Sequence, residues 1–185
     1  MLTKPKLSQV RSAVLISGRG SNLQALLDKE GCNIRLVCSH KKSAPGILKA
    51  KRCGIPTKIF SPLRFAELEA FLKEKYIEKI FLLGFMKILP EGFVHQWQGQ
   101  IVNLHPSLLP LYPGTHSIER SFEDKNKLGV SLHTVIPAMD EGPIIQQSCV
   151  AGKDSSFYPQ TLEQAAQQIA MREHFLVRKY EDHWL

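Results

Sequence analysis

The sequence predicts an α/β fold: a doubly wound, mostly parallel sheet with helices on both faces. Short apolar, β-branched segments alternate along the chain with segments whose apolar residues recur at helical spacing. Strands joined through helices pair in parallel by right-handed crossovers. The 185 residues, 43% hydrophobic and 22% charged, suit one globular domain. We therefore expect a single domain over residues 1–185, with residues 1–9 as a flexible arm.

Each expected element has its own local signal. A glycine-rich turn ends the first apolar segment, Pro56 favours an edge position for the third strand, and Pro90 stands in the first turn of a short helix, where proline is tolerated. The last helix is amphipathic. The expected strands are 10–17, 33–39, 54–60, 77–83, 101–104, 129–136 and 144–150, and the expected helices follow residue 20 and cover 44–52, 62–76, 90–97, 118–126 and 161–182.

Composition favours a cytoplasmic protein. No apolar run approaches the roughly 20 residues that span a bilayer, and the N-terminal segment lacks the apolar core of a signal peptide. The four cysteines form no metal-binding or redox pair, so we expect buried thiols in a reducing compartment, Cys38 in a strand and Cys53 at a helix end.

The net charge of +7 raises the question of a nucleic-acid partner. The one basic cluster, Lys41, Lys42, Lys49, Lys51 and Arg52, is accompanied by no nucleic-acid-binding motif and no aromatic stripe. It is either a solvated helix face or a patch that steers anionic small molecules. We expect neither a nucleic-acid nor a membrane partner.

The segment SGRGSN, residues 17–22, joins the first strand to the first helix. Glycines let the backbone approach a ligand closely, and backbone N–H groups at a helix start attract phosphate. An equally good interpretation is a tight turn in which Ser21 or Asn22 caps the helix. The motif lacks the spacing of a dinucleotide site or a P-loop.

Polar residues end the strand at 101–104. Asn103 and His105 are two residues apart, so in an extended chain both side chains leave the same face. Pro106, Pro110 and Pro113 follow and end the strand. An amide and an imidazole then meet at the carboxyl end of a strand, where open α/β sheets bind ligands. Without other evidence, a capping Asn and a packed loop His are the better explanation of the pair.

Four segments together resemble one family. SGRGSN, GFMKIL at 84–89, NLHPSLLPLYPG at 103–114 and DEGP at 140–143 are similar in order and spacing to motifs of the formyltransferases that use 10-formyltetrahydrofolate. The chain looks closest to the glycinamide ribonucleotide formyltransferases of purine synthesis. The resemblance covers residues 10–147 and extends weakly into the last helix. It implies a fold with a Rossmann-like N-terminal half.

The resemblance also implies site residues. It assigns catalysis to Asn103, His105 and Asp140. It assigns the phosphate of the acceptor substrate, glycinamide ribonucleotide, to Gly20, Ser21 and Asn22. It assigns the ribose of the same substrate to Glu173, although Ala170 stands where the family often has a glutamine. The folate co-substrate would contact Arg64, Met86, Lys87, Ile88, Leu89 and Asn103. From the residues alone, Met86, Ile88 and Leu89 are better explained as core, and Asp140 as a turn former. The family also favours a cis bond at Leu109–Pro110.

The implied reaction moves a formyl group from 10-formyltetrahydrofolate to the amine of glycinamide ribonucleotide, without a metal. Asn103 would donate to the developing oxyanion, and His105, supported by Asp140, would move the proton. A 10-formyltetrahydrofolate deformylase is the nearest alternative, disfavoured because that family carries an N-terminal regulatory domain. A sugar-nucleotide N-formyltransferase and a non-catalytic binding protein are two others. We expect a monomer or homodimer that acts on small molecules.

Overall fold

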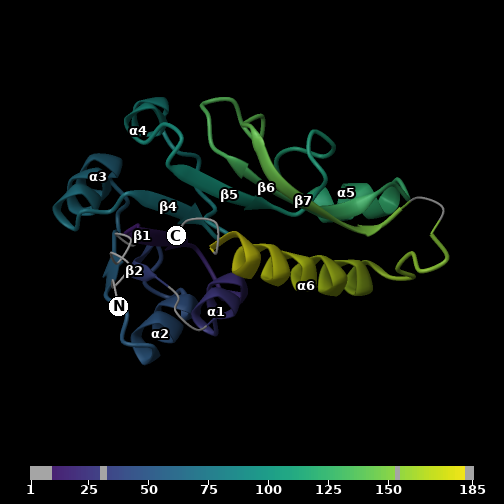
Figure 1. The fold of residues 1–185 in the computed structure, drawn as a ribbon, viewed down its shortest axis with the longest axis horizontal. Helices are drawn as coiled ribbons and strands as arrows, with labels where there is room; N and C mark the ends of the chain where they lie inside the picture. The colour runs from purple at the N-terminus through teal and green to yellow at the C-terminus, as the bar shows by residue number, and fades with distance from the viewer. Residues whose placement is uncertain (1–9, 30–32, 153–154, 182–185) are drawn as a thin grey trace, which may run out of the picture.

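The protein is described by a computed structural model, which covers residues 10–29, 33–152 and 155–181. Its centre is a seven-stranded sheet in the order β3-β2-β1-β4-β5-β6-β7 (Figure 1). The strands are β1 (Ser12–Ile16), β2 (Ile34–Ser39), β3 (Thr57–Ile59), β4 (Lys79–Leu82), β5 (Ile101–His105), β6 (Leu128–Thr134) and β7 (Ile144–Ala151). The arm expected over residues 1–9 lies outside the described residues.

The sheet is parallel from β3 to β5 and then changes direction. β1 pairs in parallel with both β2 and β4, and β4 pairs in parallel with β5. β6 is antiparallel to β5, and β7 is antiparallel to β6. The mostly parallel sheet is therefore confirmed. The carboxyl ends of β1 and β5 lie on one rim, separated by β4, so the segment after β1 and His105 share an edge of the sheet.

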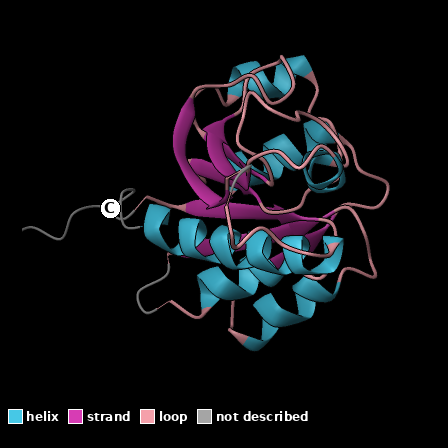
Figure 2. Cartoon of the chain, turned by 90° about the vertical axis from the view of Figure 1, so that its right-hand side faces the viewer, coloured by secondary structure: helices cyan, strands magenta, loops and turns pink. Residues whose placement is uncertain are grey.

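Helices cover both faces, as the sequence predicts. They are α1 (Ser21–Leu27), α2 (Pro45–Arg52), α3 (Phe65–Glu74), α4 (Glu91–Gln96), α5 (Ser117–Glu123) and α6 (Leu162–Glu181). Figure 1 shows α3 and α4 on one side of the sheet and α1, α2 and α6 on the other, and Figure 2 shows α6 running across the sheet on this second side.

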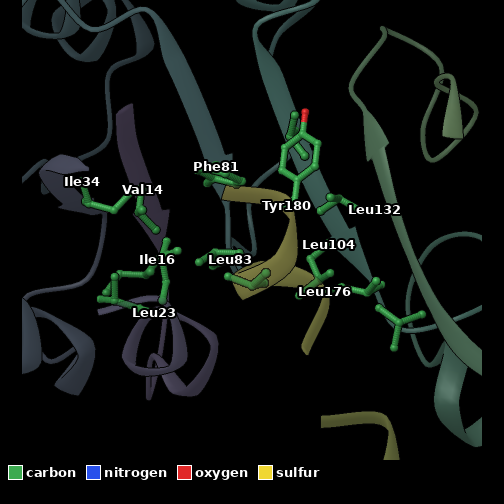
Figure 3. Close-up of a cluster of buried hydrophobic side chains, with 14 of the residues drawn as sticks. Val14, Ile16, Leu23, Ile34, Phe81, Leu83, Leu104, Leu132, Leu176 and Tyr180 are labelled. Atoms are coloured by element: carbon green, nitrogen blue, oxygen red, sulfur yellow. The ribbon is translucent and has the colours of Figure 1, made fainter. Parts of the chain in front are cut away.

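Two hydrophobic cores reflect the alternation of side chains along the central strands. Val14 and Ile16 of β1 join the core beneath α1, α2 and α6 (Figure 3), and Ala13 and Leu15 join the core beneath α3 and α4. On β5, Val102 and Leu104 face the first core, whereas Ile101 faces the second. Asn103 and His105 therefore leave the sheet on the side of Ile101, as their spacing predicts.

Several expected boundaries shift. The strand expected at 54–60 shortens to Thr57–Ile59, at the edge that Pro56 favours. The helix expected from residue 62 begins at Phe65, after a cis Ser61–Pro62 bond, and β5 extends to His105. The cis Leu109–Pro110 bond is confirmed.

The cysteines divide between core and surface. Cys38 is buried in β2, where burial, opposed by the charge of Lys58, raises the pKa of its thiol to about 12. The expectation that Cys53 is buried is wrong, because the residue after α2 is turned to solvent; Cys149 is exposed too. Within the described ranges, no helix is both long enough and apolar enough to cross a membrane.

Candidate active site

Neighbouring strands bring together Asn103, His105 and a third side chain, His133. The β5–β6 register sets Asn103 opposite His133 and His105 opposite Ser131. On β6, Val130 and Leu132 belong to the first core, so His133 leaves on the opposite face, beside Asn103. The Asn103 amide Nδ2 lies 3.1 Å from His133 Nε2. The pairing thus places an amide and two imidazoles on one face of the sheet.

The hairpin loop between β6 and β7 carries Asp140 back over these side chains. Asp140 has φ 56°, a left-handed conformation that Asp tolerates better than most residues. Gly142 lies so close to Thr134 that an added Cβ would overlap its carbonyl oxygen, so only glycine fits. Thr134 N donates to Pro143 O over 3.0 Å and closes the loop. The loop geometry therefore fixes where the Asp140 carboxylate lies.

The Asp140 carboxylate has three partners. Its Oδ2 accepts a 2.8 Å hydrogen bond from Gly114 N and lies 3.4 Å from His105 Nδ1, and its Oδ1 lies 3.6 Å from His133 Nε2. Burial raises the pKa of the Asp140 carboxyl, but the His133 and Gly114 hydrogen bonds and the charges of His105 and His133 outweigh it and lower the pKa overall. Asp140 is therefore ionised at neutral pH.

Both ring nitrogens of the buried His105 face oxygen acceptors. Nδ1 faces Asp140, and Nε2 lies 3.0 Å from the carbonyl oxygen of Tyr112. Carbonyl and carboxylate oxygens only accept, so a doubly protonated imidazolium satisfies both contacts at once. The Tyr112 carbonyl can reach the ring because Tyr112 adopts φ 56°. His105 thus lies between two oxygen acceptors, and whichever ring nitrogen carries a proton can donate it to the oxygen that it faces.

Buried polar groups anchor the proline-rich loop after β5. Ser131 Oγ donates to Ser107 O over 2.7 Å and accepts from Leu109 N over 2.9 Å. Gln147 Nε2, from β7, donates to both Ser131 Oγ and Leu109 O over 2.8 Å. These bonds tie the loop carrying the Tyr112 carbonyl, the acceptor that His105 Nε2 faces, to the antiparallel strands.

The glycine-rich turn after β1 is built from backbone. The residue that precedes α1 is Gly20, with φ 67°, and no side chain caps the helix, so the expected Ser21 or Asn22 cap is wrong. A Cβ on Gly20 would lie 2.9 Å from the Cα of Gly46, and Gly46 N donates to Gly18 O over 3.1 Å. The start of α2 therefore packs directly against the turn.

Asn22 and Glu173 meet behind this turn. Burial raises the pKa of the Glu173 carboxyl to about 7, and a hydrogen bond from Asn22 offsets part of the increase. The Asn22 Oδ1 atom is buried and has no hydrogen-bond partner among the described residues. The structure thus places the two residues assigned to the acceptor's phosphate and ribose side by side, with a buried acceptor atom still unpaired.

The segment assigned to the folate follows β4, whose residue Leu82 pairs with Asn103. Met86 and Ile88 are 69% and 75% exposed, so their interpretation as core residues is wrong; Leu89 packs against the second core. The Met86 backbone N–H donates to the buried Ser17 Oγ over 2.7 Å, which ties this loop to the glycine turn. Exposed apolar side chains beside a polar cluster suit the binding of a flat, partly apolar ligand.

Among the described residues, no hydrogen bond or ion pair joins Arg64 to these groups. It forms an exposed ion pair with Glu67, at 3.0 Å, just before α3. It also lines a surface hollow with Phe71 and Glu74, and among the described residues none of Met86 to Leu89 lines that hollow. The structure therefore describes Arg64 as a surface residue, and its contact with the folate stays a prediction of the family resemblance.

His133 is the site residue that the sequence did not single out. It was expected only as part of the strand at 129–136. Its alternation with Val130 and Leu132 could have indicated which face it occupies, but its contact with Asn103 depends on an antiparallel register that no motif encodes. Among the residues that the structure covers, no three His, Cys, Asp or Glu side chains form a group that could hold a metal ion.

The fold and this polar cluster define a class of protein. The chain belongs to the formyl transferase family, whose model matches residues 10–177. Phosphoribosylglycinamide formyltransferase of Escherichia coli (strain K12) is 39% identical over 150 residues, which are 74% of this chain and 71% of that protein. A solved phosphoribosylglycinamide formyltransferase from Anaplasma phagocytophilum superposes with a TM-score of 0.86 at 38% identity, over 93% of this chain and 85% of that one.

Longer relatives contain the same region. The trifunctional purine biosynthetic protein adenosine-3 of Drosophila melanogaster is 41% identical over 165 residues, 80% of this chain. Those residues are 12% of that protein, so the chain spans only a small part of the trifunctional relatives it matches.

Proposed function

We propose that this protein transfers the formyl group of 10-formyltetrahydrofolate to the amine of glycinamide ribonucleotide, a step of purine synthesis. The observation that carries the proposal is the cluster of Asn103, His105 and Asp140 on one face of the sheet, with His105 Nδ1 lying 3.4 Å from Asp140 Oδ2. The membership of this chain in the formyl transferase family and the names of its relatives support the same reaction.

The residues of the cluster have complementary tasks in this chemistry. Attack of the amine on the formyl carbon creates a tetrahedral centre whose oxygen becomes anionic, and a positioned donor to such an oxygen contributes on the order of 3 kcal/mol. Asn103 is a neutral donor whose strength does not vary with pH. His105 donates a proton to the folate nitrogen as it leaves, and Asp140 stabilises the imidazolium before that transfer. The proton that the attacking amine loses passes to the neutral His105 imidazole and restores its protonated form.

The surroundings of His105 fix the direction of proton movement. For its Nε2 proton to reach the substrate, the ring must leave the Tyr112 carbonyl, since Nδ1 faces Asp140. Asp140 stays in place because Gly114 N–H holds its Oδ2. We infer that the carboxylate acts as the fixed element and the imidazole as the moving one.

The two substrates meet at the rim of the sheet. The turn at Gly20, Ser21 and Asn22 would hold the acceptor's phosphate with backbone N–H groups and the Ser21 hydroxyl, and Glu173 would accept from the ribose hydroxyls. The loop from Met86 to Leu89, with Asn103, would hold the folate. The folate is a co-substrate, and this chemistry needs no metal.

The decisive experiment is a formyl-transfer assay with and without glycinamide ribonucleotide. We expect tetrahydrofolate to be released only when the acceptor is present, together with the formylated product. Equal release without the acceptor would identify a 10-formyltetrahydrofolate deformylase. Transfer to an amino-sugar nucleotide and not to glycinamide ribonucleotide would identify a sugar-nucleotide N-formyltransferase, and no turnover with folate binding intact would leave a binding protein.

We further propose that residues 1–185 act as one cytoplasmic domain, as a monomer or homodimer. Three free cysteines in the described part of the chain suit a reducing compartment. Light scattering at the concentration of the activity assay would establish the number of copies.

A further inference from the structure

Two polar side chains that the proposed chemistry does not use, Ser17 and His40, meet at the rim of the sheet. β1 lies between β2 and β4 (Figure 1), and its last residue, Ile16, pairs with Ser39 at the end of β2. The next residues along the two strands are Ser17 and His40. Parallel pairing therefore brings His40 beside the residue that begins the glycine turn.

The buried Ser17 hydroxyl contacts both neighbouring segments. Its Oγ accepts a 2.7 Å hydrogen bond from the Met86 backbone N–H, in the loop after β4, and lies 3.3 Å from His40 Nδ1. A serine hydroxyl accepts through its lone pairs and donates its single proton. Because Met86 N–H can only donate, the hydroxyl proton points to His40 Nδ1. Ser17 thus relays one hydrogen bond into another.

This relay requires a neutral His40 ring, since only an unprotonated Nδ1 can accept. Burial lowers the pKa of the His40 imidazole, and the charges of Lys87 and Lys41 lower it further. The ring is therefore neutral at neutral pH. The two lysines follow Met86 and His40 in the sequence, so both cations belong to the segments that the hydroxyl joins.

The position of His40 is itself fixed from two sides. The Phe85 ring packs edge-on against the His40 ring, with centroids 5.4 Å apart and planes at 86°, a favourable aromatic arrangement. The turn after β2 is closed by Ser39, whose Oγ accepts from Lys41 N over 3.0 Å and donates to Lys41 O over 3.2 Å. Phe85 precedes Met86, so the ring contact and the hydroxyl hold neighbouring residues of one loop.

The loop has little other support at this point. The side chains of Met86 and Ile88 are mostly exposed, so they add little packing that would fix the backbone. The conformation around Met86 therefore depends on the hydrogen bond to Ser17 and on the contact of Phe85 with His40. The proposed function gives this same loop the task of holding the folate.

We propose that Ser17 and His40 are positioning residues for the folate co-substrate, which hold the Met86 backbone, and with it the loop to Leu89, in the conformation that binds the folate. This inference rests on the proposed function and deepens it. Neither residue needs to touch the folate. Ser17 acts through the Met86 N–H, and His40 acts by accepting the Ser17 proton and so fixing the direction of the hydroxyl.

The first test uses the protein without folate. Hydrogen exchange at the Met86 amide, followed by NMR, should be slow in the wild type and about tenfold faster in Ser17→Ala, which removes the acceptor. The matched control is Ser12→Ala at the other end of β1, because Ser12 and Ser17 are equally buried, at 4% exposure. Ser12→Ala should leave exchange at Met86 unchanged.

The second test measures binding of tetrahydrofolate, the product that remains after formyl transfer. Ser17→Ala should raise its Kd, and KM for 10-formyltetrahydrofolate, about tenfold, the scale of a lost hydrogen bond that leaves a donor unpaired. KM for glycinamide ribonucleotide should not change, because the backbone of the turn is intact. Ser12→Ala should match the wild type, and urea unfolding of both variants separates a general loss of stability from a loss of folate affinity.

A pair of variants tests the relay through His40. His40→Phe keeps an aromatic ring for the contact with Phe85 but removes the Nδ1 acceptor, and it should weaken tetrahydrofolate binding about fivefold. His40→Asn removes the ring but keeps an acceptor near the position of Nδ1, so it should restore most of this affinity. If the Asn variant binds no better than the Phe variant, the role of His40 as an acceptor is overturned.

Failure of this inference is distinguishable from failure of the proposed function. If the wild type binds tetrahydrofolate and Ser17→Ala binds it equally well, only the positioning role is overturned. Exchange at the Met86 amide that is equally fast in the wild type and in Ser17→Ala would overturn it as well. If the wild type binds no tetrahydrofolate, the proposed function fails and the positioning role fails with it.

Discussion

The turn after β1 and the polar cluster on β5 and β6 hold functional groups at the same sheet in different ways. At the turn, the donors are backbone groups of consecutive residues, and Gly20 and Gly46 let two backbones touch. In the cluster, the groups are side chains of Asn103, His133 and Asp140, which come from three segments and meet only through strand register and a folded-back loop.

The difference teaches where each region is vulnerable. The turn depends on local conformation, so a single substitution within it changes the turn and leaves the antiparallel strands intact. The cluster depends on long-range pairing, so a change at the β6–β7 hairpin displaces Asp140 although the hairpin is distant in sequence from His105. Four substitutions test this contrast, in order of decreasing effect.

The largest effect is expected from Gly142→Ala, which should break the cluster and spare the turn. Its Cβ would overlap the Thr134 carbonyl, so the hairpin must shift. We expect a loss of about 3 kcal/mol or more in the free energy of unfolding, measured by urea denaturation. Any protein that folds should lose formyl transfer yet keep its affinity for glycinamide ribonucleotide at the turn.

The control is Gly152→Ala, whose added Cβ would meet no atom within 4 Å. It should change the free energy of unfolding by less than about 0.5 kcal/mol. Equal effects at positions 142 and 152 would mean that the close approach at Thr134 does not constrain the hairpin.

Asp140→Asn should lower kcat by about 10²-fold or more, the scale of general acid–base catalysis. Asn tolerates the left-handed conformation and can still accept from Gly114 N–H, so the fold should survive. A folate analogue should bind nearly as well as to the wild type. Near-normal kcat would reduce Asp140 to a structural role.

The same variant should change how stability depends on pH. Because the native pKa of Asp140 lies below its unfolded value, its pairing stabilises the wild type at neutral pH and is lost as pH falls through the native pKa. The Asn variant should lack this part of the acid destabilisation.

His133→Gln should sharpen the comparison, because His133 reaches the polar cluster only through the pairing register of β5 and β6. We expect kcat to fall about tenfold, as expected for one lost hydrogen bond to a charged group. The His133 hydrogen bond lowers the pKa of Asp140, so its loss raises that pKa and moves the acidic limb of the kcat profile to higher pH. The exposed His95, changed to Gln, is the control; equal profiles for both variants would remove His133 from the site.

Glu173→Gln should give the smallest effect, on stability. The native carboxyl, with a pKa near 7, binds a proton between pH 4.5 and 7 that the unfolded chain does not, so the wild type loses stability as pH rises through this window. The Gln variant should lack this loss, so its stability relative to the wild type should rise between pH 4.5 and pH 8. An unchanged pH dependence in calorimetry would contradict the assignment.

The sequence predicted the parts of this molecule that local patterns encode. Asn103 and His105 share a face because strands alternate, and the glycine turn follows β1 because glycines punctuate strand ends. The reversal of β6 and the partnership of His133 depend on pairing between distant segments, which periodicity does not specify.

Two interpretations were wrong for a physical reason. Met86 and Ile88 were expected as core because apolar residues after a strand are usually buried. In the structure, the Met86 N–H donates a hydrogen bond to the Ser17 hydroxyl, and both side chains point to solvent. Ser21 and Asn22 were expected as helix caps because of their residue types, but Gly20 takes that position in a left-handed conformation.

The contact between Gly20 and Gly46 has a thermodynamic consequence. A Cβ on Gly20 would lie 2.9 Å from the Gly46 Cα, so the turn has no side chain at this contact and loses no rotamer freedom there when it takes up a ligand. In the polar cluster, the proposed proton transfer requires the His105 ring to leave the Tyr112 carbonyl, and that rearrangement carries its own enthalpy. The entropy of binding at the turn should therefore be similar for acceptor analogues of the same shape. The value of kcat, in contrast, should depend strongly on temperature.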